Sequence, residues 1–350
     1  YTMEDIFLGV LHMRWDTGID LGTQQVRMAG AAGLILDEPS YIAMREDGSA
    51  AYVGENAWRL LGRAPKGLTV EGSLRDGVPE STMYAQRMFQ WLFRRAEAEK
   101  RRRHAVLISC APFARPAYRE ALMQAALDAG ATDVALVRSD AVCALGSGVD
   151  LMGPQATFVI DVGAGKMTAT LFSMGRQAAF GSLPYGMNRV NERIIDALKA
   201  EYGFAAGFRT AEDIKLALAS AHPGDVSKVK ARAAGLDLFA RLPRLVEIAP
   251  EMITRLCQDP LRELMGMCSA VIANAPEELS ADLNDVGATL AGGGAQIPGL
   301  DKLIGDTLGI PCSIAEAPAL CGIKGIRAML LEPDRYQSLV WQRMALAQRR

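Results

Sequence analysis

Three glycine-containing turns, near the start, in the middle and near the end, constrain the fold of this chain more than any other feature. They occupy residues 18–23, 161–165 and 291–295. The first two follow β-type runs and carry an aspartate beside their glycines, and the third contains three consecutive glycines. A single short glycine pattern recurs by chance, so the information lies in the order and context of the set.

Each turn has the composition of a phosphate or nucleoside contact. Backbone N–H groups of a glycine turn can point at phosphate oxygens, because no Cβ keeps the ligand away. The carboxylates of Asp20 and Asp161 would hold a Mg²⁺ ion through water; for Asp20 the alternative is capping of a tight turn. The third turn would let a nucleoside lie flat on bare backbone. The set therefore predicts a nucleotide clamp with two phosphate turns and one adenosine turn.

The predicted contacts follow from the turns. They are Gly22, Thr23, Gln24 and Gln25 in the first, Gly163, Ala164, Gly165 and Lys166 in the second, and Gly292, Gly293, Gly294 and Ala295 in the third. For the two glutamines an ordinary polar turn is the alternative. The Lys166 ammonium either approaches the terminal phosphate or points to solvent.

Composition limits the class of protein. With 350 residues, 50% of them hydrophobic, the chain can bury more than one core. Lys+Arg 38 against Asp+Glu 40 leaves no global field to recruit nucleic acid. Six cysteines without Cys-x-x-Cys spacing, and only three histidines, argue for reduced thiols and against zinc. No apolar run reaches about 18 residues and no signal peptide is recognised, so a soluble intracellular chain is expected.

Periodicity and turn signals predict an α/β chain of two related halves. Strands are expected within 17–28, 34–43, 104–111, 134–137, 157–173 and 242–248, and helices over 81–99, 116–129, 188–202, 210–220, 250–274 and 300–308. A capping pattern, Thr210 with Asp213, is expected to open the helix over 210–220. Because the hairpin near residue 18 returns near residue 161, the halves should face each other across the nucleotide.

The order of these segments resembles the actin, sugar-kinase and heat-shock-chaperone ATPase superfamily, and within it the MreB-like bacterial actins. The motifs outside the clamp that carry this resemblance occupy residues 36–40, 53–55, 60–63, 76–78, 125–131, 209–215 and 300–301. The resemblance implies a two-lobed actin-like fold, with duplicated ribonuclease H-like domains around a nucleotide cleft. Lobe I would comprise 1–150 and 325–350 with a small subdomain at about 34–78, and lobe II 151–324 with one at about 186–248. Lys215 would lie near the ribose or base, or be a solvated helix lysine.

Several positions depart from the family pattern. Where MreB-like proteins have Glu-Glu-Pro, with one glutamate positioning the attacking water, this chain has Arg138, Ser139 and Asp140. Asp140 is the remaining candidate for a catalytic carboxylate, but it is displaced by one residue, and errors of about 1 Å can cost about a hundredfold in rate. Lys166 and Met167 replace the two threonines of the second phosphate turn. We therefore expect nucleotide binding with slow or absent hydrolysis, and whether the chain is an ATPase stays open.

The resemblance implies a cytoskeletal protein that binds ATP or ADP with Mg²⁺ and polymerises head to tail for rod-shape determination. Its partners would be further copies, the inner face of the cell membrane and wall-synthesis membrane proteins, which predicts a cytoplasmic or peripheral location. Candidate membrane segments are 3–13 and 336–350, with basic residues at 94–95 and 100–103; packing on their own domain or plain surface exposure is the alternative. The rival functions are a non-polymerising regulatory paralogue and a small-molecule kinase.

Overall fold

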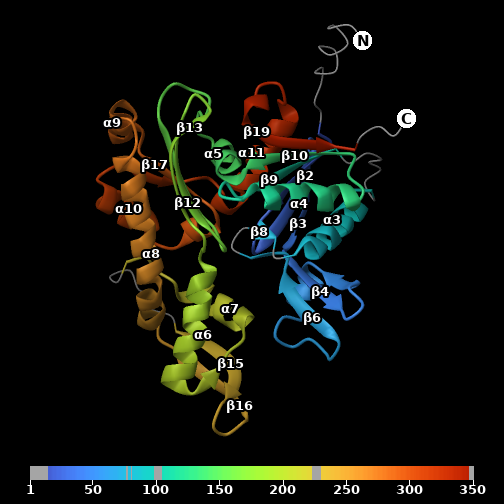
Figure 1. Cartoon of the computed structure of the whole chain (residues 1–350). Helices are drawn as coiled ribbons and strands as arrows, with labels where there is room; N and C mark the ends of the chain where they lie inside the picture. Colours follow the sequence, from blue (N-terminus) through green and yellow to red (C-terminus); the bar gives the residue numbers. More distant parts are fainter. Residues whose placement is uncertain (1–14, 76–77, 80, 98–104, 223–229, 347–350) are drawn as a thin grey trace.

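Two large β-sheets with the same strand order organise the chain (Figure 1). The computed structural model describes residues 15–75, 78–79, 81–97, 105–222 and 230–346. Read from the hairpin edge, the first sheet runs β3-β2-β1-β9-β10-β19 and the second β13-β12-β11-β17-β18, so the first has one additional edge strand, β19. Their strands are β1 (Thr17–Leu21), β2 (Gln25–Gly30), β3 (Gly33–Pro39), β9 (Ala105–Cys110), β10 (Asp133–Arg138), β19 (Val340–Ala345), β11 (Thr157–Val162), β12 (Met167–Ser173), β13 (Arg176–Leu183), β17 (Ala288–Ala291) and β18 (Cys312–Ile314).

The two sheets are built from the same hairpin. β1 pairs antiparallel with β2 and parallel with β9, and β11 pairs antiparallel with β12 and parallel with β17. The first hairpin closes with Gly22 N–H donating to the Gln25 carbonyl at 3.0 Å, and the second with Gly163 N–H donating to the Lys166 carbonyl at 2.9 Å. The α/β fold with two related halves, predicted from this repeat, is confirmed. The lobe boundaries near residues 150 and 325 stay predictions.

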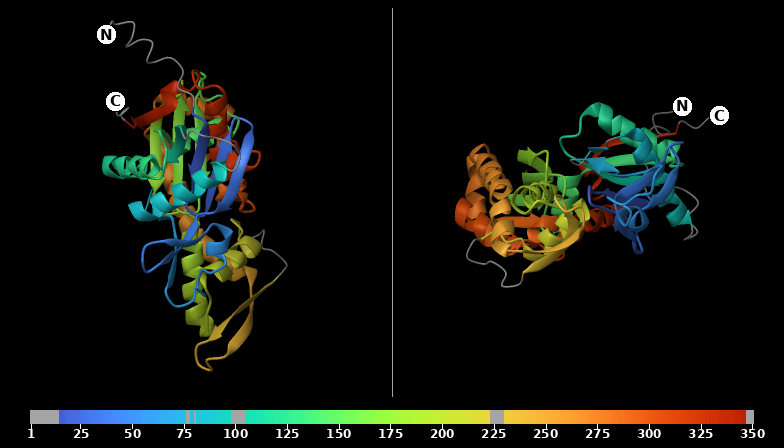
Figure 2. Two further views of the ribbon diagram at one scale, coloured as in Figure 1. Left: turned by 90° about the vertical axis from the view of Figure 1, so that its right-hand side faces the viewer. Right: turned by 90° about the horizontal axis from the view of Figure 1, so that it is seen from below.

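Two three-stranded sheets lie together at one end of the molecule (Figures 1 and 2). One contains β4 (Tyr41–Arg45), β5 (Ala50–Val53) and β6 (Leu68–Gly72), and the other β14 (Phe204–Ala205), β15 (Ala231–Asp237) and β16 (Pro243–Ile248); β7 (Leu74–Arg75) and β8 (Val78–Pro79) form a further short pair. The β15–β16 hairpin reaches furthest in this direction (Figures 1 and 2). The small sheets therefore extend the two halves away from the large sheets.

Helices cover the sheets and fill the space between them. They are α2 (Glu55–Trp58), α3 (Thr82–Glu97), α4 (Pro116–Asp128), α5 (Ser139–Gly146), α6 (Asn188–Tyr202), α7 (Phe208–Leu218), α8 (Pro250–Ala273), α9 (Glu277–Val286), α10 (Leu300–Leu308) and α11 (Cys321–Leu331), with short 3₁₀ turns η1 (Gly293–Gln296), η2 (Pro318–Leu320) and η3 (Gln337–Leu339). Separate hydrophobic cores lie in each half, and a third cluster joins them. More than one core was expected from composition.

Helices α5 and α11 cross in direct backbone contact between the halves (Figure 1). A Cβ on Gly146 would lie 1.8 Å from the Cys321 carbonyl oxygen, and one on Gly325 would lie 1.9 Å from the Val142 carbonyl oxygen. α5 also contacts β11 and β12 of the second sheet, and α11 contacts β1 and β2 of the first. Glycine is therefore required at the contact that joins the two halves.

The helix predicted over 210–220 is α7, which begins two residues earlier after Gly207 and has no side-chain cap, so the predicted Thr210 cap is wrong.

The C-terminal segment forms an edge strand, β19, antiparallel to β10. The Arg119 guanidinium lies over the Trp341 ring, 4.1 Å from the ring centroid, so the described part of the tail, up to residue 346, packs on its own half. Residues 3–13, 100–103 and 347–350 lie outside the described residues. No helix in the described segments is long and apolar enough to span a membrane.

Candidate functional site

A cleft of about 660 Å³ lies between the two halves, and all three glycine turns line it. The predicted residues that the structure brings together there are Asp20, Gly22, Thr23, Gln24, Gln25, Asp161, Gly163, Ala164, Gly165, Lys166, Lys215, Gly292, Gly293 and Gly294. Two predicted residues do not line it, Ala295 and Asp140. Ala295 is fully buried, because the 3₁₀ turn η1 directs it into the core of the second half.

The two hairpin turns touch each other across the cleft. A Cβ on Gly165 would lie 2.3 Å from Thr23 Oγ1, so no larger residue fits there without displacing the opposite turn. On its other side the second turn is held by the segment before α6, where Met187 N–H donates to the Gly163 carbonyl at 2.9 Å. Backbone groups of both turns are consequently presented to one shared space.

Asp20, the fourth residue of β1, is partly buried at the wall of the cleft. Ser109 Oγ donates a 2.7 Å hydrogen bond to Asp20 Oδ1 and accepts one from Leu21 N–H at 3.2 Å. A Cβ on Gly322 would lie 2.4 Å from Asp20 Oδ2, so the glycine makes room for the carboxylate. Burial raises the pKa of Asp20, although the Ser109 hydrogen bond and the nearby Arg27 and Lys166 act against it. This carboxylate is held in place by its own scaffold.

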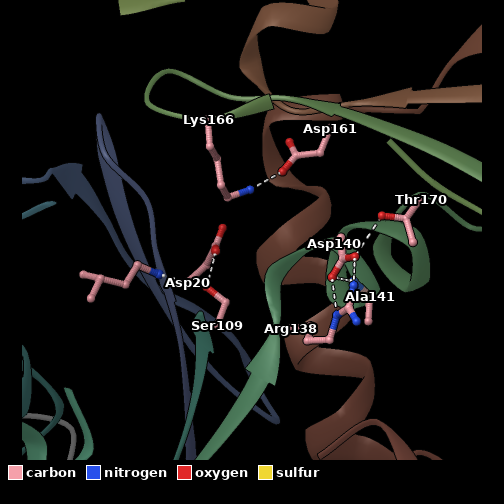
Figure 3. Close-up of polar contacts among 9 residues, drawn as sticks. Asp20, Ser109, Arg138, Asp140, Ala141, Asp161, Lys166 and Thr170 are labelled. Carbon is pink, nitrogen blue, oxygen red and sulfur yellow. Dashed lines mark hydrogen bonds and ion pairs between the residues drawn. The ribbon is translucent and has the colours of Figure 1, made fainter. Parts of the chain in front are cut away.

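Asp161, the equivalent residue of the second hairpin, is ion-paired. Its Oδ2 lies 2.6 Å from Lys166 Nζ, and Figure 3 shows the two side chains pointing toward each other, with Asp20 on the far side of the ammonium. Burial, the largest single effect, lowers the pKa of the Lys166 ammonium, but attraction by Asp161, together with smaller contributions from Cys143 and Asp140, raises the net pKa. The lysine is therefore charged at neutral pH. A Cβ on Gly292 would lie 2.4 Å from Asp161 Oδ1, so this carboxylate also requires a glycine neighbour.

The expected magnesium site fits these side chains poorly. Divalent cations in proteins are held by oxygen ligands, directly or through water. One of the two candidate carboxylates already has an ammonium at contact distance. Among the described residues, no group of three or more His, Cys, Asp or Glu side chains could hold a metal ion. Cys143 lines the cleft, but magnesium prefers oxygen ligands to thiols.

Asp140 faces away from the cleft. Its Oδ2 lies 2.6 Å from Arg138 Nη2 and accepts a hydrogen bond from Thr170 Oγ1 at 2.8 Å, and only 2% of the residue is exposed (Figure 3). This carboxylate therefore links α5 to β12. Ser139, one residue earlier, lines the cleft instead, and its buried hydroxyl has no hydrogen-bond partner among the described residues.

One wall of the cleft comes from α7. Lys215 Nζ lies 2.7 Å from Glu212 Oε2 and donates to the Met187 carbonyl at 3.3 Å. Asn191 Nδ2 donates to the same Glu212 oxygen at 2.5 Å. Lys215 is therefore a buried, paired lysine at the cleft wall rather than a solvated one.

Sequence reasoning missed several lining residues. They include Ser109, Glu212, Met187, Ile297, Pro298 and Gly322. Ser109 had a usable signal, because a polar residue at the carboxyl end of a buried parallel strand commonly faces a ligand. The others come from separate segments that only the fold brings together.

An aromatic contact beside the cleft joins α2 of one half to α7 of the other. Trp58 of α2 lies edge-on to Phe208 of α7, with ring centroids 6.4 Å apart. Tyr41 packs on the other side of Trp58 at 4.7 Å, and its hydroxyl donates to Gln24 Oε1 at 3.2 Å. Through Tyr41, the first hairpin turn is thereby connected to this aromatic contact.

Comparison with known proteins agrees with this architecture. The family model described as "MreB/Mbl protein" matches residues 14–338. The chain belongs to the MreB/Mbl family. The cell shape-determining protein Mbl of Bacillus cereus is 31% identical over 323 residues, covering 91% of this chain and 97% of the relative. MreB of Escherichia coli is 31% identical over 319 residues, covering 89% and 91%.

A solved MreB structure superimposes on nearly the whole chain. MreB5 of Spiroplasma citri bound to ADP has a TM-score of 0.87 and 26% identity, covering 93% of this chain and 99% of that one. This likeness includes both halves of the MreB/Mbl fold. The two-lobed actin-like fold with a central cleft, expected from the sequence, is thereby confirmed.

Proposed function

We propose that this chain is an ATP- and ADP-binding bacterial actin that assembles head to tail into filaments and hydrolyses ATP slowly or not at all. The observation that carries the proposal is the meeting of both aspartate-bearing hairpins and the triple-glycine turn in one cleft. The likeness to Spiroplasma citri MreB5, solved with ADP and with AMPPNP, supports an adenine nucleotide as the ligand. The relatives of this chain from Bacillus cereus and Escherichia coli are named as cell shape-determining proteins. We extend that role to this chain and place it at the inner face of the membrane.

The cleft offers distinct places for the two parts of a nucleotide. The backbone at the tips of the two turns, 23–24 and 164–165, suits the phosphates, because N–H groups in such turns bind anions. Gly292, Gly293 and Gly294, with Ile297 and Pro298, provide a flat, partly apolar surface that suits the adenosine. The Glu212–Lys215 pair lies at the wall between them and suits the ribose hydroxyls.

Weak hydrolysis follows from what occupies the attacking-water position. In the pattern that the family implies, a glutamate stands where this chain has Ser139, whose hydroxyl cannot act as a carboxylate base at neutral pH. Asp140 does not replace it, because its carboxylate is held by Arg138 and Thr170 outside the cleft. The chain would therefore bind ATP but hydrolyse it slowly or not at all.

The filament part of the proposal is supported by an apolar surface at the end of the molecule. Around the β15–β16 turn, the exposed fractions of Phe239, Leu242 and Leu245 are 88%, 63% and 69%. Contiguous exposed apolar side chains commonly mark an interaction site. An end surface of this kind suits a heterologous contact with the next copy, and heterologous contacts that do not close generate filaments.

Phe239→Ser is expected to raise the critical concentration for assembly by about tenfold, because removing a central aromatic from an interface commonly costs about 1–2 kcal/mol. Sedimentation with and without ATP measures this concentration. Tyr118→Ser is the matched control, since Tyr118 is an exposed aromatic, 43% exposed, on the outer face of α4. Assembly that is equally impaired by both variants, or by neither, would contradict the assignment of this end surface.

A non-polymerising regulatory paralogue is the second candidate. The observation that favours it is the Lys166–Asp161 pair, which alters the site that couples nucleotide state to assembly in the family. The same sedimentation experiment decides between them. A wild-type chain that stays in the supernatant at all concentrations with ATP would select the paralogue and reject the filament.

A further inference from the structure

Lys166 occupies an unusual place in the cleft, between the two carboxylates expected to manage the charge of a nucleotide. Its Nζ lies 2.6 Å from Asp161 Oδ2, and the ammonium also interacts electrostatically with Asp20 (Figure 3). The side chains of Lys166 and Asp161 are only 15% and 7% exposed. This ion pair is therefore part of the built site rather than a surface contact.

The pair competes with a metal for the same carboxylate. An ammonium at contact distance donates a charge-assisted hydrogen bond, which is among the stronger polar interactions in a protein. A hydrated divalent cation bound to Asp161 would have to displace the ammonium or share the carboxylate with it. Separating a buried ion pair leaves an uncompensated charge, which is strongly unfavourable. The pair thus disfavours magnesium at Asp161.

The ammonium also supplies part of the positive charge that a metal would bring. Asp20, Asp161 and Lys166 together carry one net negative charge, whereas the two aspartates with a threonine, as in the family pattern, would carry two. Polyphosphate placed beside this cluster meets less repulsion. A flexible, compact ammonium can also turn toward a phosphate oxygen while it stays close to the carboxylate.

We propose that Lys166 takes the place of the divalent cation at Asp161, so that this chain binds adenine nucleoside diphosphates and triphosphates without requiring magnesium. The proposal rests on the nucleotide-binding function proposed above and specifies its cation requirement. Lys166 acts as a positioning and charge-compensating residue in the binding of phosphate.

The test is calorimetric titration of the full chain with ADP, once with excess MgCl₂ and once with EDTA. For the wild type we expect the two dissociation constants to agree within about threefold, a coupling close to one between metal and nucleotide. For Lys166→Met we expect ADP to bind about tenfold or more weakly in EDTA and to recover when MgCl₂ is added. Lys166→Arg, which keeps the charge, should behave more like the wild type than Lys166→Met does.

Lys215→Met is the matched control, because Lys215 is the other buried, ion-paired lysine lining the cleft but its partner is Glu212. Its loss should weaken ADP binding equally in both buffers. A wild-type chain that binds ADP at least about tenfold more tightly with MgCl₂ than with EDTA would overturn the inference and leave nucleotide binding intact. Absence of binding in both buffers would overturn the proposed function and, with it, the inference. The wild-type comparison stands whether or not the variants fold.

Discussion

Gly325→Ala is expected to destabilise the chain by about 3 kcal/mol or more, although it adds a single methyl group. A Cβ at this position would lie 1.9 Å from the Val142 carbonyl oxygen and 3.0 Å from the Gly146 backbone nitrogen. Main-chain atoms of α5 cannot rotate away as a side chain could, so the two helices must move apart. Because these helices join the two sheets, the strain falls on the contact between the halves. The midpoint of thermal unfolding should drop by at least about 5 °C.

Gly266→Ala is the control for helix propensity. Gly266 lies in the interior of α8, and beyond its own helix no described residue has a heavy atom within 4 Å of the position its Cβ would take. Exchange of a helix glycine for alanine in open space should stabilise by about 0.5–1 kcal/mol. If the two variants melt at the same temperature, α5 and α11 do not pack by backbone contact as described.

Ser139→Glu is expected to accelerate phosphate release from ATP by about tenfold or more, since a positioned general base contributes about 10²–10⁴-fold. Ser139 is the first residue of α5, lines the cleft and has an unpaired hydroxyl, so a longer acidic side chain can extend into the cleft without losing a hydrogen bond. A carboxylate at a helix N-terminus is also electrostatically favourable. Steady-state phosphate release, with nucleotide saturating, measures the effect.

Ser139→Gln separates charge from size, because glutamine has the length of glutamate without its basicity. It should release phosphate as slowly as the wild type. Equal rates for the Glu and Gln variants would show that this position does not set hydrolysis. Wild-type release at the rate of Escherichia coli MreB, measured side by side, would contradict weakened hydrolysis itself.

The fold and the three turns could be read from the sequence because they depend on local patterns. Glycines at 22 and 163 close hairpins of the same geometry, and each follows a strand whose penultimate residue is an aspartate. Because those features repeat along the chain, the two halves and the cleft between them could be predicted. The family resemblance pointed to the same arrangement through motifs outside the turns.

Side-chain pairing could not be predicted, because it depends on which segments meet in space. The sequence left Lys166 equally free to face solvent, and only the fold places it on Asp161. It also offered Asp140 as a carboxylate for the cleft, whereas Arg138 and Thr170 hold it on the other side of α5. Ala295 follows three cleft-lining glycines, but the 3₁₀ turn η1 places its side chain in the core of the second half and not in the cleft.

The most direct test of the account is whether adenine nucleotide binds in the cleft at the triple-glycine turn. Gly293 is exposed there, and apart from its chain neighbours no described residue has a heavy atom within 4 Å of where its Cβ would lie, so Gly293→Phe should fold normally while its ring fills the adenosine place. Calorimetric titration with ADP should show one site in the wild type and binding weakened about a hundredfold or more in the variant, at an unchanged melting temperature. A wild-type chain that binds no ADP at millimolar concentration, or a variant that binds it as tightly as the wild type, would contradict the account.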